Sequence, residues 1–412
     1  MLKKFAKTLF LPVIIFIFAA SVSAWDDVGH KLSAYIAWQQ MTPAVREKVI
    51  KILLSAPEDS DLSVLYPPDS RSDAAKQREL FMVAAYWSDI VRDRKFKNRF
   101  EKYHHSNWHY SDTFWTNENG QVKILPNPNE DGGKAVEKLY DFEKVLKDSG
   151  ASDADKAVAI AWILHLGGDI HQPLHTSARI TEFEPKGDQG GNLFLLTPKD
   201  TPREKQENLH WFWDSIVKRS VLRQTDACDS DYLPPIAAQM MKKYPLAKMQ
   251  NRLELGQFDK WQQESFRIAT SEFFPPTLIR FQAPSEKYKK RAFEIGQQQI
   301  ALAGYRLGAM LNQIFGGQTV AQTDSLKTQA CHIIRVVSYP VTKIIDPQNP
   351  PKNRICLLNV CPPDKGMVSR PMTAKMINGK VVYREYDVVK VFENADEARK
   401  YAQENGILDV NF

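Results

Sequence analysis

The sequence predicts a mainly α-helical protein with a small α+β appendage at its C-terminus. Two observations support this fold class. Apolar residues recur at helical spacing in most segments between residues 30 and 315. Beyond the polar stretch 318–330 the composition changes to β-rich runs, with an Asn-Gly hairpin signal at residues 378–379. The 412 residues are enough for two domains, and we predict a multi-helical catalytic domain over residues 25–317 and the appendage over 325–412.

Residues 1–24 have the pattern of a secretory signal peptide. Lysines at positions 3, 4 and 7 precede an apolar run over Phe10–Ala20 that is too short for a comfortable membrane span. Small or modest residues at 22–24 offer a cleavage site directly before Trp25. An uncleaved anchor is the alternative. We expect an exported protein, periplasmic or secreted, with no stable membrane span after signal cleavage.

Charge and cysteine content limit the classes of function less than the motifs do. Loss of three signal lysines lowers the formal net charge from +6 to +3, so charge alone does not indicate a nucleic-acid partner. Export implies an oxidising compartment, in which four cysteines allow three pairings. The disulfide candidates, whose pairing stays open, are Cys228, Cys331, Cys356 and Cys361.

The first half of the chain reads as helices joined by polar loops. Helical spacing of apolar residues indicates helices over residues 32–41, 45–54, 81–93 and 133–148. The third of them places Asp89 at the end of an apolar stripe and Arg92 one turn on. His109 then follows among aromatic residues, with Asp112 three positions later, and residues 113–131 read as a loop.

The central stretch of the chain is AWILHLGGDIHQPLH, over residues 161–175. An almost wholly apolar helix, with Ser152 as a plausible N-cap, leads into His165 and Asp169, which are one turn apart on one face. Pro173 tends to end the helix nearby, before His175. A buried His and Asp need partners, and either an ion pair between them or a shared zinc ion would satisfy them.

A second His-Asp pair follows the central stretch. Gly190 and Gly191 form a turn or let the backbone approach a ligand. His210 and Asp214 then repeat the four-residue spacing among Trp and Phe residues, which predicts another buried helix. Further helices are indicated over residues 231–247, 257–272 and 286–315, the last ending at Gly316-Gly317.

Cleavage after residue 24 would make Trp25 the N-terminal residue, five positions before His30. An α-amino group has a pKa of about 7.7–8.0, so a metal deprotonates it easily, and the amine and carbonyl of one residue can chelate one ion. The mature chain thus offers enough nitrogen and oxygen donors for more than one zinc ion. The candidates are the amine of Trp25 and the side chains of His30, Asp89, His109, His165, Asp169, His175, His210 and Asp214.

Six motifs occur in one order across residues 25–315: WDDVGH, YWSDIVR, WHYSD, HLGGDIHQPLH, GGNLF and NLHWFWD. In these the chain resembles the S1/P1 nuclease family of secreted trinuclear zinc enzymes. That family is mostly α-helical and related to zinc-dependent phospholipase C. The cysteines depart from the disulfide pattern of the fungal members, which leaves the covalent framework open. The appendage lies outside the resemblance.

The resemblance implies three Zn²⁺ ions and a role for each matching residue. One zinc takes the ligands Asp89, His109, His165 and Asp169. Its close neighbour takes the amine and carbonyl of Trp25, His30 and the bridging Asp169. The third takes His175, His210 and Asp214. Arg92 matches a phosphate-contacting position, which makes Asp169 and Arg92 the catalytic candidates. Asp112 and Asn192 match positions that contact the nucleobase, and His171 matches no direct ligand.

The implied activity is endonucleolytic hydrolysis of single-stranded DNA or RNA to 5′-phosphorylated products, together with 3′-nucleotidase activity. Zinc suits this chemistry because it lowers the pKa of bound water to about 7. A zinc-dependent phospholipase C is the alternative, although that family has a glutamate where this chain has Asp214. A non-catalytic zinc- or host-binding protein is a second alternative, supported by the unexplained appendage but not by the presence of Arg92.

Overall fold

The computed structural model describes residues 25–67, 72–129, 131–221 and 229–316, together with three strands between 341 and 385. These residues form mostly helices, with two small three-stranded sheets, which confirms the mainly α-helical prediction. The predicted signal peptide and all four cysteines lie outside the described residues. Among the described helices, none is long and apolar enough to cross a membrane.

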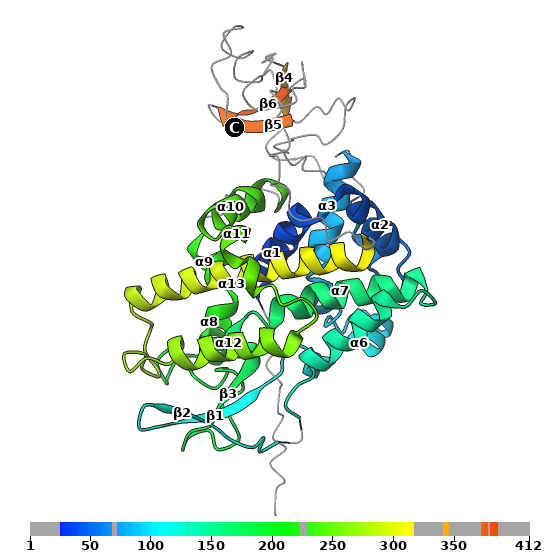
Figure 1. The fold of residues 1–412 in the computed structure, drawn as a ribbon. Helices are drawn as coiled ribbons and strands as arrows, with labels where there is room; N and C mark the ends of the chain where they lie inside the picture. Colours follow the sequence, from blue (N-terminus) through cyan, green and yellow to red (C-terminus); the bar gives the residue numbers. More distant parts are fainter. Residues whose placement is uncertain are drawn as a thin grey trace, which may run out of the picture.

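Three helices form the centre of the molecule: α1 (Asp27–Gln40), α7 (Asp153–Asp169) and α13 (Glu286–Phe315). Figure 1 shows α13 crossing the body beside α1, with α7 next to both. Gly304 allows the close approach of α1 and α13, because a Cβ there would lie 2.6 Å from Cβ of Ile36. The backbone pairing is therefore set by a missing side chain, and it places the start of α1 near the end of α7.

The other helices surround this centre. The larger ones are α2 (Pro43–Leu54), α3 (Asp73–Ala84), α6 (Ala135–Lys147), α10 (Asp229–Lys243) and α12 (Phe258–Glu272). The shorter ones are α4 (Trp87–Ile90), α5 (Lys97–Tyr103), α8 (Leu209–Asp214), α9 (Ile216–Ser220) and α11 (Leu246–Met249). The chain also makes 3-10 turns, including η3 (Ser106–Trp108), η4 (Pro173–Thr176) and η6 (Gln250–Arg252).

Two predicted helices are wrong in their bounds. The segment 231–247 is divided between α10 and α11, because Tyr244 and Pro245 separate them. The segment 81–93 is not continuous, because α3 begins earlier, where Ser72 caps its N-terminus, and ends at Ala84. The chain then turns through Ala85 and Tyr86 before α4 begins at Trp87. The apolar periodicity runs through this break because both pieces bury residues in the same core, so the pattern carries no sign of the interruption.

A small sheet was missed in the segment read as a loop. It contains β1 (Thr113–Glu118), β2 (Gln121–Ile124) and β3 (Ser177–Arg179) in the order β2-β1-β3. β1 pairs antiparallel with β2 and parallel with β3. The turn between β1 and β2 is Asn119-Gly120, with φ of 55° and 84°. This dipeptide is a hairpin signal that could have identified the first two strands.

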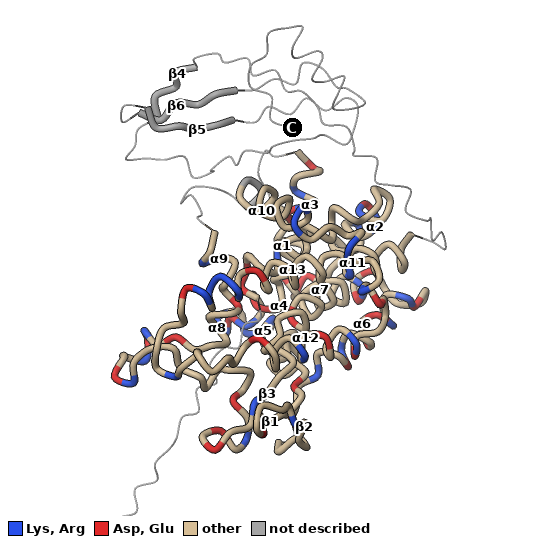
Figure 2. Tube along the Cα trace, turned by 60° about the vertical axis from the view of Figure 1, so that its left-hand side comes forward, with Lys and Arg blue, Asp and Glu red and all other residues tan. Residues whose placement is uncertain are grey.

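The described part of the C-terminal region is a second sheet, which contains β4 (Val341–Ile345), β5 (Met372–Ile377) and β6 (Lys380–Glu385) in the order β4-β6-β5. Ile377 pairs with Lys380 in the antiparallel β5-β6 hairpin, which confirms the Asn-Gly signal at residues 378–379. The appendage as a domain of its own, over 325–412, stays a prediction. Acidic and basic residues are interspersed over the helices (Figure 2), in keeping with the modest net charge.

Candidate metal centre

The end of α7 is the place where polar side chains enter the core. Ser152 caps the start of the helix by accepting a hydrogen bond from the Asp155 N–H, and a buried apolar run then leads to His165 and Asp169. Gly168 lies between these two residues. A Cβ at Gly168 would lie 2.8 Å from Nδ1 of His30, so the glycine makes room for the imidazole that α1 supplies.

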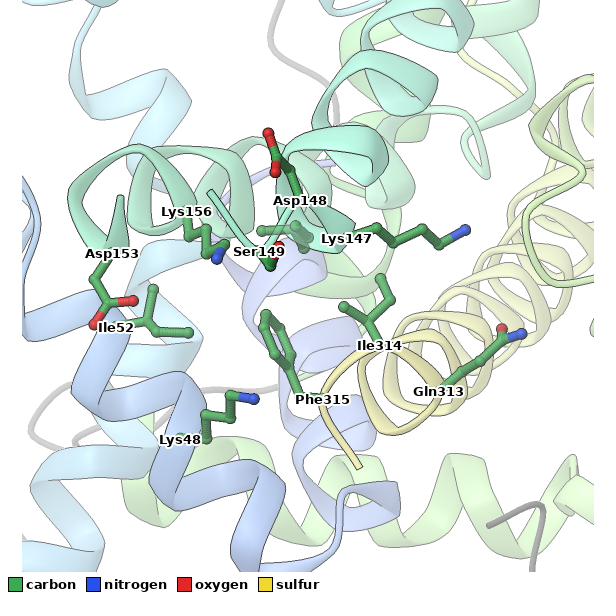
Figure 3. A pocket seen from close by; sticks show the side chains of 11 residues that line it. Lys48, Ile52, Lys147, Asp148, Ser149, Asp153, Lys156, Gln313, Ile314 and Phe315 are labelled. Atoms are coloured by element: carbon green, nitrogen blue, oxygen red, sulfur yellow. The ribbon is translucent and has the colours of Figure 1, made fainter. Parts of the chain in front are cut away.

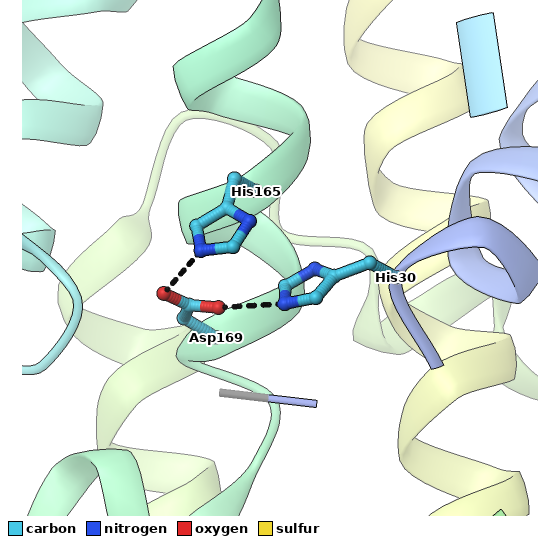
Figure 4. A group of neighbouring side chains, drawn as sticks. All are labelled: His30, His165 and Asp169. Atoms are coloured by element: carbon cyan, nitrogen blue, oxygen red, sulfur yellow. Dashed lines mark ion pairs between the residues drawn. The ribbon is translucent and has the colours of Figure 1, made fainter. Parts of the chain in front are cut away.

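Asp169 is the centre of a first cluster of ligand-type side chains. Its Oδ2 lies 3.3 Å from Nε2 of His165 and 3.2 Å from Nδ1 of His109, whereas its Oδ1 lies 3.2 Å from Nε2 of His30. Figure 4 shows the carboxylate between the rings of His30 and His165. Asp89 completes the cluster, with Oδ1 3.9 Å from Nε2 of His165. The two oxygens of Asp169 thus face different partners, which is the arrangement that a bridging ligand needs.

The break between α3 and α4 orients one of these histidines. Nδ1 of His165 lies 2.8 Å from the carbonyl oxygen of Ala85, the C-cap residue of α3. A carbonyl only accepts, so Nδ1 carries the proton and Nε2 presents its lone pair to the cluster. The carbonyl is available because the last turn of a helix lacks intrahelical donors. The interruption that sequence periodicity did not reveal therefore fixes a ligand tautomer.

A second cluster contains His175, His210 and Asp214. Nε2 of His175 lies 3.8 Å from Oδ1 of Asp214, and Nε2 of His210 lies 3.5 Å from Oδ2. Hydrogen bonds hold each member in place: Nδ1 of His175 donates to the His109 carbonyl at 2.6 Å and Nδ1 of His210 to the Gly190 carbonyl at 2.8 Å. Nε2 of Gln172 donates to Oδ1 of Asp214 at 2.6 Å.

Gly190 has to be a glycine for this arrangement. Its φ is +60°, and a Cβ there would lie 2.4 Å from the carbonyl oxygen of Leu174. The glycine pair that follows the central stretch is therefore more than an ordinary turn, since it brings a carbonyl to His210.

Both clusters fit a metal. Within the described part of the chain, several buried ligand-type atoms make no hydrogen bond, among them Nε2 of His30, His109 and His175, Oδ1 of Asp169 and Oδ2 of Asp214. Unsatisfied buried polar atoms are costly, and a cation would satisfy these together. Ligand atoms lie within 4.8 Å of one another in three groups: His30, His165 and Asp169; Asp89, His109 and His165; His175, His210 and Asp214. This set of nitrogen and oxygen donors is typical of zinc.

Burial governs the electrostatics of the clusters. It raises the pKa of Asp169 and Asp214 well above the usual range, helped in Asp169 by the neighbouring Asp89 carboxylate and opposed by Arg92. It raises the pKa of Asp89 to about 6, and it lowers the pKa of His165 well below its usual value. Neutral imidazoles keep their lone pairs for a metal, whereas the crowded carboxylates need a positive charge nearby.

The other predicted residues lie around the clusters. Nε of Arg92 lies 3.0 Å from Oδ1 of Asp89, so the guanidinium is tied to a cluster carboxylate. Asp112 is partly buried, and burial together with the Asp188 and Asp131 carboxylates raises its pKa well above the usual range. Nδ2 of Asn192 donates to the Gln189 carbonyl at 2.9 Å.

Trp25 also lies at the clusters. It is fully buried, and the next residue, Asp26, donates its backbone N–H to the carbonyl of Asp214 at 3.0 Å. The Asp26 carboxylate caps α1 by accepting from two backbone N–H groups. The start of the predicted mature chain is thus fixed between Asp214 of the second cluster and His30 of the first. Whether its amine is free stays a prediction.

His171 does not join either cluster, as the resemblance implies: its Nδ1 donates to the Gly167 carbonyl, and its Nε2 accepts from Nη1 of the buried Arg306 at 2.7 Å. Trp211 is 44% exposed, although its neighbours on α8 are buried.

A cavity of about 430 Å³ lies at the opposite end of α7, beside Asp153 and Phe315 (Figure 3). It is therefore about 24 Å along the helix from Asp169.

The fold and the clusters together define a mainly α-helical protein with a candidate multinuclear metal centre. The chain belongs to the S1/P1 nuclease family, whose model matches residues 25–316, so the resemblance seen in the motifs is confirmed.

Three relatives show how far the similarity extends. Endonuclease 1 of Arabidopsis thaliana is 23% identical over 330 residues, which cover 74% of this chain and 92% of that protein. Endonuclease 2 of the same plant is 23% identical, covering 72% and 93%. Nuclease P1 of Penicillium citrinum is 21% identical over 196 residues, covering 45% and 68%.

Proposed function

We propose that this protein is an exported zinc-dependent endonuclease that hydrolyses phosphodiester bonds of single-stranded DNA or RNA to 5′-phosphorylated products and also removes 3′-phosphates from nucleotides. The observation that carries the proposal is the convergence of buried His and Asp atoms without hydrogen bonds on two neighbouring clusters. Family membership supports the reaction class, because the relatives are named as nucleases and endonucleases.

The residues divide into three zinc sites. Asp89, His109, His165 and Asp169 would hold one ion; the amine and carbonyl of Trp25, with His30 and the shared Asp169, would hold a second; His175, His210 and Asp214 would hold the third. When bound, zinc supplies Lewis acidity toward the phosphodiester and lowers the pKa of water to about 7. No described side chain is then required as a general base.

Arg92 orients the phosphate. A guanidinium has five N–H donors, so it can keep Nε on Asp89 and present other donors to a phosphoryl oxygen. Because Asp89 is itself a proposed ligand, this contact couples the position of the phosphate to the first cluster. Its contribution is that of a charge-assisted hydrogen bond, about 1.5–3 kcal/mol.

Asp112 and Asn192 would contact a nucleobase. Asp112 lies three residues after His109. Asn192 lies two residues after Gly190, whose carbonyl accepts a hydrogen bond from His210. Each is therefore attached to a cluster by a short piece of chain. A base that stacks and pairs with protein side chains must be free of a complementary strand. This accounts for a preference for single strands.

The test is a digestion assay on single-stranded DNA, RNA and a 3′-nucleotide, with and without chelator, and with phosphatidylcholine as a fourth substrate. We expect hydrolysis of the nucleic acids that stops with chelator and returns with zinc. Hydrolysis of phosphatidylcholine with no activity on single-stranded DNA would instead establish the phospholipase alternative. Zinc binding without hydrolysis of any substrate would establish the non-catalytic one.

A further inference from the structure

A second cavity, of about 290 Å³, lies beside the loop that carries Asn192. Its walls come from the segment after β3 and from the chain between α12 and α13, and they include Arg179, Phe183, Glu184, Asp188 and Arg280. None of these residues has a part in the metal clusters. The cavity therefore has no role in the proposed chemistry as derived above.

The walls of this cavity are held in place without a ligand. Arg280 forms an ion pair with Glu184 and lies over the Phe194 ring, with its Cζ 4.9 Å from the ring centroid. Glu184 also accepts a hydrogen bond from the hydroxyl of Thr181. The Arg179 guanidinium lies over the Phe274 ring at 4.8 Å. Because these side chains are already held in place, binding of a ligand would cost little side-chain entropy.

Two polar atoms in these walls lack partners. Asp188 is only 2% exposed; its Oδ1 accepts the backbone N–H of Arg179 at 2.9 Å, whereas its buried Oδ2 makes no hydrogen bond to any described residue. Nε of Arg179 is likewise buried and makes none within the described chain. One buried acceptor and one buried donor in the walls are thus unsatisfied, and a small movement of these side chains would offer both to a planar ligand that carries an N–H and a carbonyl or ring nitrogen.

Phe183 provides the aromatic surface. Its side chain is 73% exposed, and the Thr181 hydroxyl accepts the backbone N–H groups of Phe183 and Glu184, which fixes the turn that holds the ring outward. A single exposed Phe is common in proteins. Beside an unsatisfied acceptor and donor in a cavity of this size, it supplies the stacking face that a nucleobase uses.

The cavity is connected to the second cluster by two short, ordered segments. Arg179 ends β3, which begins two residues after His175, so at most about 13 Å of chain separates the cavity wall from a proposed ligand. Asp188 lies two residues before Gly190, whose carbonyl accepts a hydrogen bond from His210. A strand whose phosphate lies at the cluster can therefore reach the cavity with a neighbouring base.

We propose that the cavity formed by Arg179, Phe183, Glu184, Asp188 and Arg280 is a nucleobase subsite for a nucleotide of the substrate strand outside the pair being cleaved. The inference rests on the proposed nuclease function. Only a polymeric substrate of at least three nucleotides would occupy the subsite, whereas a dinucleotide or a single 3′-nucleotide would be hydrolysed without it. The subsite also gives a role to Phe183, which lies outside the six motifs.

The test compares the deoxyadenosine dinucleotide, which fills only the scissile pair, with the tetranucleotide. For the wild type we expect kcat/KM on the tetranucleotide to exceed that on the dinucleotide about tenfold, the gain from one stacked base. Phe183→Ala should remove this difference through KM while leaving the dinucleotide kinetics unchanged, and Phe183→Trp should restore it. Val64→Ala, at another exposed apolar side chain, serves as the matched control and should leave both substrates unaffected.

An abasic residue placed at each position of the tetranucleotide in turn identifies the base concerned. At one outer position it should cost the wild type about tenfold and Phe183→Ala nothing further, because both changes remove the same stacking contact. Equal effects of Phe183→Ala on both substrates, or none on either, would overturn the subsite while leaving the nuclease function in place. A wild type that cleaves neither oligonucleotide would overturn the nuclease function and the subsite with it.

Discussion

The two clusters of the candidate metal centre use the same residue types on different supports. In the first, His30, His165 and Asp169 project from α1 and α7, long helices that pack in the core. In the second, His175 lies in the four-residue turn η4, and His210 and Asp214 lie on the six-residue helix α8. Helix packing orients the first set, with one hydrogen bond from His165 to the Ala85 carbonyl. Hydrogen bonds from Gln172 and to two loop carbonyls orient the second.

Because the two clusters are built differently, loss of a carboxylate should affect a different number of bound ions in each. The first has two carboxylates, and one of them, Asp169, has Oδ2 facing His109 and His165 and Oδ1 facing His30, so its failure should affect two ions together. The second has one carboxylate facing two histidines, and its failure should affect one ion. The predictions below test that division, beginning with the largest expected effect.

Asp169→Asn should cost more than Asp214→Asn. An amide is neutral and has one oxygen, so the first substitution should remove two zinc ions and lower kcat about a thousandfold or more. The second should remove one ion and cost about a hundredfold. Metal analysis alongside single-strand hydrolysis measures both, with Asp153→Asn at the exposed start of α7 as the control. Equal zinc contents in the two mutants would contradict the bridging role of Asp169.

A change at the N-terminus, which precedes α1, tests the ligands of the first cluster. We predict that the mature chain begins at Trp25 and that its amine binds metal. A retained Ala24 would convert the amine into a peptide nitrogen, so one ion should be lost and activity should fall about a hundredfold. N-terminal sequencing and metal analysis check this. Fully active, zinc-replete enzyme beginning at another residue would rule out the ligand role of Trp25.

Arg92→Ala should have a smaller effect than Asp169→Asn. Loss of one charge-assisted contact corresponds to about 1.5–3 kcal/mol, or about ten- to a hundredfold in kcat/KM. Zinc content should stay at the wild-type value, because Arg92 contacts Asp89 and is not itself a ligand. Losses of similar size in the two mutants, with zinc retained in both, would argue against two ions sharing Asp169.

Gln172→Ala tests whether hydrogen bonds support the second cluster. Removing the donor to Oδ1 of Asp214 should weaken binding of one zinc about ten- to a hundredfold, as for other groups that orient metal ligands. Competition with a fluorescent chelator measures that affinity. The other two ions should be held as in the wild type, whereas a uniform loss of all three would show that the clusters are coupled.

The helices were predictable where one face or all faces are buried, because periodicity reports burial directly. The segment 286–315 matches α13 to the residue, and Ser152 caps α7 as expected. The break after α3 and the strand β3 were not predictable in this way. Both depend on contacts distant in sequence: Ala85 meets His165 80 residues on, and β3 pairs with β1.

For the site, the sequence identified the pairs that share a helix face. Residue spacing alone gives no measure of which pairs meet. The resemblance implies that His109 and His165, 56 residues apart, share a site, and the packing brings them together. Gln172 was missed as a supporting residue, since nothing in its local pattern indicates that its amide reaches Asp214, 42 residues on. The cavity beside Asn192 has no motif at all and appears only when β3 and the segment around Arg280 come together.

The smallest catalytic effect should come from removing the C-terminal region. We predict that truncation after residue 318 leaves both clusters intact, because every proposed ligand lies before residue 215 and α13 ends at Phe315. Hydrolysis of a small 3′-nucleotide at low temperature should match the full chain. Stability is a separate observable: if Cys356 pairs with Cys361, then Cys228 pairs with Cys331, and losing that link costs about 2–5 kcal/mol.

The two observables separate a stabilising region from one that builds the site. A lower Tm, with or without weaker binding of long single strands, is compatible with a catalytic domain that ends near residue 317. A soluble truncation with three zinc ions and no activity on the small substrate is not. That result would show that residues beyond 318 help to position the substrate at the clusters, and the boundary at 317 would then be wrong as a limit of the functional unit.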